Sequence, residues 1–73
     1  MPEQTEYEAR AALILKAELK RAGVTYAQLA ERLQGMGIDE KEANIRNKLA
    51  RGKFSAAFMI QCMTAIGLNE LRL

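Results

Sequence analysis

The sequence contains no histidine, one cysteine and one proline, and only 5% of its residues are aromatic. Without histidine or a second cysteine it lacks the ligand sets of zinc and iron sites, so we expect no metal and no cofactor. No nucleophile has an evident base and no carboxylates are evidently paired, so we expect no enzymatic activity. A lone cysteine, Cys62, cannot form an internal disulfide, which favours a cytoplasmic location.

Long hydrophobic runs are also absent. None is longer than residues 11–15, far shorter than the ~20 residues of a membrane-spanning helix, and the amino terminus is acidic, so we expect no membrane span and no targeting segment. Hydrophobic residues make up 49% of the 73 residues and charged residues 27%, as in folded domains. The length predicts a single domain over residues 1–73, with its folded core over about 6–67. The sequence shows no evident site for a small-molecule ligand.

Four helices are predicted from hydrophobic periodicity and from the residues that begin and end helices. Thr25 with Gln28, and Asp39 with Glu42, have the spacing of capping boxes. The predicted ranges are about 5–22 before Gly23, 26–34 after Thr25, 40–50 between Asp39 and Gly52, and 56–66 between Ser55 and Gly67. Two glycines at 35 and 37 predict a turn between the second and third helices.

The apolar positions of these helices predict a common core. It comprises Leu15, Leu19, Leu29, Leu33, Ile38, Ile45, Leu49, Phe58, Cys62 and Ile66, with Ala12 and Ala22 on the inward side of the first helix. Further apolar residues cannot all point inward in so small a domain: Leu13, Ile14, Ile60, Leu71 and Leu73. We therefore expect a homodimer formed through the first helix or the tail.

Positive charge is concentrated in one short stretch. Residues 1–40 carry a net charge of −2, residues 41–53 carry +4, and residues 54–73 are neutral. A cluster of this kind suits a surface that faces phosphates, although a solvated basic helix would have the same composition.

A helical wheel with Ile45 and Leu49 on the buried side places amides and cations on the outer side of the third helix. Few oppositely charged residues are expected to pair along it, so the helix should gain little from its own charges. The residues predicted to point outward are Glu40, Ala43, Asn44, Asn47 and Arg51, with Lys41 and Lys48 on one flank and Arg46 on the other. Asparagine can pair with adenine, arginine with guanine, and the remaining cations with phosphates.

Two resemblances follow from these residues. The run from Thr25 to Leu33, the glycine turn, the polar helix with Ile45, and the segment 51–54 followed by an apolar helix resemble the lambda repressor and Cro type of helix-turn-helix domain. The stretch 43–49 followed by Arg-Gly-Lys-Phe also resembles a family of short uncharacterised bacterial proteins. Spacing departs from the repressor pattern, being about two residues longer between Ile38 and Ile45 and one longer from there to Gly52.

The repressor resemblance implies an all-α, four-helix helix-turn-helix fold whose third helix enters the major groove. It implies recognition roles for Lys41, Asn44 and Asn47, and a phosphate-contacting or bracing role for Gln28. The resulting prediction is a sequence-specific, homodimeric regulator of transcription that binds double-stranded DNA. The predicted DNA-binding residues are Gln28, Lys41, Asn44, Arg46, Asn47, Lys48, Arg51 and Lys53.

Two other functions stay open. A small adaptor or antitoxin-like module would use the same basic helix to bind an acidic protein. RNA binding is less favoured, because the basic stretch lacks the aromatic side chains on which single-stranded bases stack.

Overall fold

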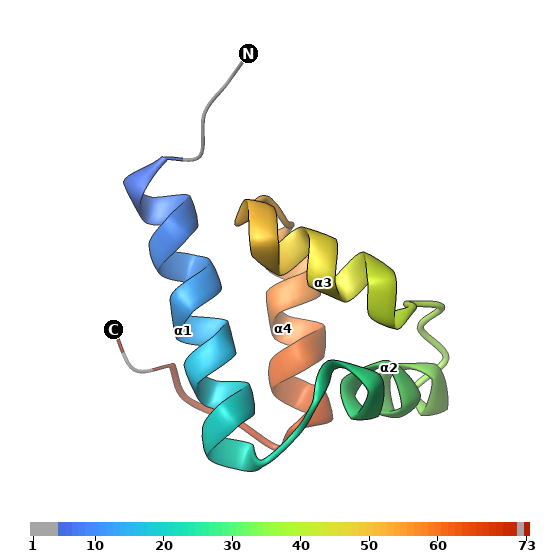
Figure 1. Ribbon diagram of the computed structural model, residues 1–73. Coiled ribbons are helices and arrows are strands. Elements are labelled where there is room, and N and C mark those ends of the chain that lie inside the picture. Colours follow the sequence, from blue (N-terminus) through green and yellow to red (C-terminus); the bar gives the residue numbers. More distant parts are fainter. Residues whose placement is uncertain (1–4, 72) are drawn as a thin grey trace.

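The computed structural model describes residues 5–71 and 73, which contain four α-helices and no strand (Figure 1). The helices are α1 (Glu6–Ala22), α2 (Tyr26–Gly35), α3 (Glu42–Arg51) and α4 (Ala56–Ala65). The predicted small all-helical fold with four helices is confirmed.

The ends of α1 and α2 follow directly from local sequence. At the start of α2, the Thr25 hydroxyl accepts from the Gln28 amide at 3.1 Å, while the Gln28 side-chain oxygen accepts from the Thr25 amide at 2.9 Å. This reciprocal pair satisfies two backbone N–H groups that have no partner within the helix. Gly23 ends α1 with φ +71°, a left-handed backbone conformation that is unfavourable for residues with a Cβ.

The start of α3 differs from the prediction. The helix begins at Glu42, its N-cap is Lys41, and no side chain caps it, so the predicted capping box at Asp39 is wrong. The preceding segment is instead bound to the end of α2. Two hydrogen bonds hold it there. The Ile38 backbone N–H donates to the Leu33 carbonyl at 2.9 Å, and the Gln34 side-chain amide donates to the Glu40 carbonyl at 3.2 Å. Six residues, 36–41, therefore join α2 to α3.

The predicted core is largely confirmed. Eight of its ten residues are buried, and Ile38 and Ile66 pack against them from half-buried positions. Val24 and Ala30 join this core although the prediction omitted them. Ala22, by contrast, is exposed at the end of α1, so its predicted inward position is wrong.

The packing leaves one side of α3 uncovered. α3 contacts both α1 and α2, and α2 also contacts α4. In Figure 1, α3 lies on one side of α1, while the segment after α4 crosses the lower end of α1 in this view and ends on the other side of α1. No helix within residues 5–71 is long and apolar enough to cross a membrane.

Candidate nucleic-acid interface

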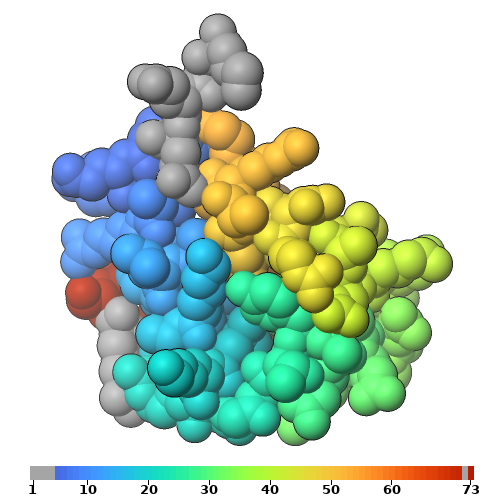
Figure 2. All heavy atoms as spheres, in the orientation of Figure 1, coloured from blue at the N-terminus to red at the C-terminus, as the bar shows by residue number. Residues whose placement is uncertain are grey.

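The outer side of α3 carries the candidate site. Ile45 and Leu49 are 0% and 1% exposed and hold the inner side of the helix against the core. In the space-filling view α3, in yellow, lies across the upper right of the molecule and presents its outer side to solvent (Figure 2). The wheel prediction is confirmed for the helical residues that it placed outward or on the Arg46 flank. The exposed residues of α3 are Ala43, Asn44, Arg46, Asn47, Ala50 and Arg51.

Two amides occupy the middle of this surface. Asn44 and Asn47 are three residues apart, and such positions are neighbours on a helix surface. Among the residues that the structure describes, neither side chain has a hydrogen-bond partner, so both amides can bind an external group. Ala43 and Ala50 beside them are too short to shield the helix backbone. A flat, polar edge can therefore approach α3 closely.

Lys48 makes its contacts within the molecule, with Glu40 and Phe58. Its ammonium lies 2.8 Å from the Glu40 carboxylate and 4.4 Å from the centre of the Phe58 ring. Glu40, predicted to point outward, is buried at 8% exposure, and that prediction is wrong because the residue precedes α3 and the helical wheel does not apply to it. Lys48 therefore joins the connection before α3 to α4, and we omit it from the candidate interface.

We expect Lys48→Met to destabilise the protein. Methionine keeps the apolar contact with Phe58 but leaves the Glu40 carboxylate without its cation, which should cost about 1–3 kcal/mol. Urea unfolding followed by circular dichroism measures this loss. The double variant Lys48→Met/Glu40→Gln should recover most of it, because the uncompensated charge is then gone. Wild-type stability in the single variant would contradict the role assigned to this pair.

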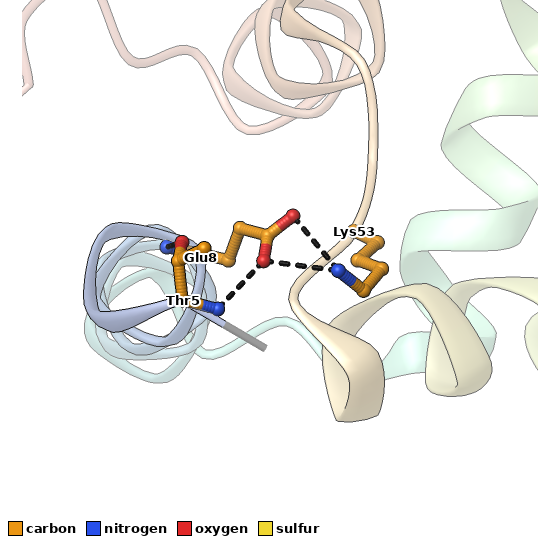
Figure 3. Close-up of polar contacts among 3 residues, drawn as sticks. All are labelled: Thr5, Glu8 and Lys53. Carbon is orange, nitrogen blue, oxygen red and sulfur yellow. Dashed lines mark hydrogen bonds and ion pairs between the residues drawn. The ribbon is translucent and has the colours of Figure 1, made fainter. Parts of the chain in front are cut away.

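Lys53 is paired across the molecule with the amino end of α1 (Figure 3). Its ammonium donates to both Glu8 carboxylate oxygens, at 3.0 and 3.2 Å, and the nearer oxygen also accepts from the Thr5 amide at 2.7 Å. These contacts lower the pKa of Glu8, the backbone hydrogen bond from Thr5 first and Lys53 second. The turn after α3 is thus bound to α1. Lys53, predicted to contact phosphate, is already paired with a carboxylate.

Glu8 should make stability depend on pH in the acid range. Because its pKa in the folded protein lies below 4.5, its contribution is present above that pH and is lost as the pH falls through the folded value. Glutamine at position 8 retains an oxygen for the Thr5 amide but carries no charge. We therefore expect Glu8→Gln to lower Tm at pH 7, and the Tm difference from wild type to shrink as the pH falls below 4.5. A Tm difference that stays constant as the pH falls would contradict this linkage.

The remaining predicted residues are dispersed around α3. Gln28 is exposed on α2, and its side-chain oxygen is used in its own capping box. Lys41 is exposed at the N-cap of α3, and Arg51 is exposed in its last turn. Arg46 forms an ion pair with Glu42 four residues earlier, a pair that the prediction of few oppositely charged partners along the helix missed. That pair has the i, i+4 spacing and was visible in the sequence.

The cations of residues 41–53 pair with Glu42, which the net charge of this stretch already includes, and with two carboxylates from outside it, Glu40 and Glu8. Glu42 is local, whereas Glu40 lies eight residues from Lys48, and Glu8 lies 45 residues from Lys53. No periodicity or spacing indicates the last two contacts. The candidate interface is therefore a polar helix surface with cations at its margins rather than a continuous basic patch.

The single cysteine belongs to the core. Cys62 is 0% exposed, and burial raises the pKa of its thiol to about 12, with the neighbouring Glu40 carboxylate acting in the same direction. At neutral pH the thiol is thus protonated and packs as a small hydrophobic group. Across residues 5–71 and 73, no three histidine, cysteine, aspartate or glutamate side chains gather in a way that could hold a metal ion.

Comparison with known proteins adds a family and no function. A family model described as a domain of unknown function (DUF6471) matches residues 7–71, a span that includes α2, α3 and α4 and nearly all of α1. No curated protein and no solved structure matches the chain. The comparisons do not extend the resemblance to the lambda repressor, which rests on the sequence pattern.

Proposed function

The chain belongs to this family of domains of unknown function, and from the exposed side of α3 we propose that it binds double-stranded DNA without catalysing a reaction. In this proposal α3 enters the major groove, and the protein is a small regulator of transcription with a preferred sequence. The observation that carries the proposal is the pair Asn44 and Asn47, which are exposed and have no hydrogen-bond partner within residues 5–71 and 73, on a helix whose other side is fixed in the core.

The dimensions of α3 suit the groove. A ten-residue helix is about 15 Å long and roughly 10–12 Å across, and the major groove of B-DNA is about 12 Å wide. Ala43 and Ala50 let the helix sit deeply, and alanine can also contact the methyl group of thymine. Each asparagine can donate to and accept from the edge of an adenine, which a lysine cannot do.

Charge at the margins of α3 supports the same partner. Lys41 stands at the start of the helix and Arg51 in its last turn, so cations flank the two amides on either side. Arg46 and Glu42 are 57% and 45% exposed, and exposed ion pairs contribute only about 0–1 kcal/mol. The Arg46 guanidinium can therefore exchange its carboxylate for a guanine or a phosphate at little cost.

The docking mode of helix-turn-helix proteins forms part of the proposal. In those proteins the first helix of the motif crosses the phosphate backbone and the second reads the bases. In this chain α2 takes the first role, with Gln28 near the backbone, and α3 takes the second. The contact between α2 and α3 supports this arrangement. Their six-residue connection is longer than the three or four residues typical of the motif, so we take the base-facing positions from exposure on α3 and not from the family register.

Selection from a pool of random duplexes, followed by fluorescence anisotropy, tests the proposal. We expect one sequence to be enriched, and its affinity to fall linearly with salt on logarithmic axes by about 0.9 per phosphate contact. A scrambled duplex of equal length is the control. Absence of binding to any duplex at 50 mM salt would contradict the proposal and favour the protein-interaction alternative.

A further inference from the structure

The side of α1 away from α3 exposes an apolar residue between two small ones. Leu13 is 64% exposed in the middle of the helix. Ala9 and Ala17 lie four residues before and after it, and residues four apart form one ridge along a helix. Small residues beside a large one allow a second helix to approach closely, because its side chains fit over the alanines.

Charges at the two ends of this ridge are complementary. Glu6 lies seven residues before Leu13 and Lys20 seven residues after it, so all three fall within about 20° of one line along the helix. If a second α1 lies antiparallel with its own Leu13 opposite, each Glu6 faces the Lys20 of the other copy. A parallel arrangement would instead place like charges together. The charge pattern thus fits an antiparallel copy of the same helix.

A neighbouring hollow extends the apolar surface. Tyr7 and Leu73 are 75% and 87% exposed, and with Ile14, Met59 and Leu71 they line a hollow of about 240 Å³. The Arg10 guanidinium donates to the Leu73 carbonyl at 2.9 Å and so holds the carboxyl-terminal segment beside α1. The hollow lies on the flank of the Leu13 ridge, where the corresponding flank of an antiparallel copy would also lie.

We propose that two copies of this chain associate through α1, antiparallel and centred on Leu13, with Glu6 of each copy paired with Lys20 of the other. Such a two-fold interface uses the same residues on both sides. α3 lies on the opposite side of α1 and stays exposed in both copies (Figure 1). With 17 residues, α1 is about 25 Å long, so one helix from each copy forms a short interface and we expect a weak dimer.

Cross-linking tests the centre of the interface independently of DNA binding. On the two-fold axis, Leu13→Cys brings two thiols together, and mild oxidation should yield a disulfide-linked dimer. Ile60→Cys is the matched control, because Ile60 is similarly exposed at 61% but lies on α4 without this charge pattern. The native Cys62 is buried and should not react. Equal cross-linking of the two variants, or none in Leu13→Cys, would overturn the proposal.

Charge exchange tests the orientation. We expect Glu6→Lys and Lys20→Glu each to weaken the dimer several-fold in sedimentation equilibrium, and the double variant to restore it, because the pairing is then reversed but intact. Circular dichroism checks that the exposed substitutions leave the helices unchanged. Failure of the double variant to recover, with both single variants folded, would rule out the antiparallel register.

Discussion

Replacing Ile45 by alanine should lower the free energy of unfolding by about 2–5 kcal/mol. The side chain is 0% exposed and is one of two that hold α3 against the core, so its loss leaves a cavity that the surrounding helices fill only in part. Small domains have unfolding free energies near the lower end of about 5–15 kcal/mol, so a large share of the stability is removed.

The control for this substitution has the same chemistry on the surface. Ile60→Ala removes the same atoms from a side chain that is 61% exposed, and its effect should stay within about 0.5 kcal/mol. Thermal unfolding measures both, since each kcal/mol corresponds to roughly 4–8 °C in Tm for a domain of this size. Similar losses in the two variants would mean that α3 does not depend on Ile45 for its position.

Replacing Asn47 by alanine should weaken binding to the selected duplex by about 1–3 kcal/mol, which is roughly 5-fold to 150-fold in Kd. The amide is proposed to pair with one base, so affinity for scrambled DNA, which depends on phosphate contacts, should hardly change. Anisotropy titrations with both duplexes measure the two effects separately.

Asn69→Ala is the matched control for the amide. Asn69 is also exposed, but it lies after α4 and outside the candidate interface, so both affinities should equal those of the wild type. Equal losses on the selected and scrambled duplexes in Asn47→Ala would contradict base recognition by this residue. Thermal unfolding of the variant checks that the loss is not one of stability.

Local signals in the sequence predicted most of the fold. The capping box of Thr25 and Gln28 and the glycine at position 23 set helix ends that the structure reproduces. Apolar periodicity predicted the core, because an amphipathic helix has one buried side whatever its partner. The start of α3 was wrong because the preceding residues bind the end of α2, and that tertiary contact outweighs the capping preference of Asp39.

The candidate site was predictable only in part. Exposure of Asn44 and Asn47 follows from the position of Ile45 on the helix, which the sequence contains. The pairing of Lys48 and Lys53 does not, because Glu40 precedes the helix and Glu8 comes from the far end of the chain. Net charge along a sequence therefore overstates the positive charge that the folded surface presents.

Two ion pairs secure α3: Lys48 in its last turn binds Glu40 in the connection before the helix, and Lys53 just beyond its end binds Glu8 on α1. A helix fixed in this way has lost most of its conformational entropy during folding, and little remains to be lost when a partner arrives. Whatever binds α3 thus meets a preorganised surface, and the shape of the backbone should be nearly the same before and after the encounter.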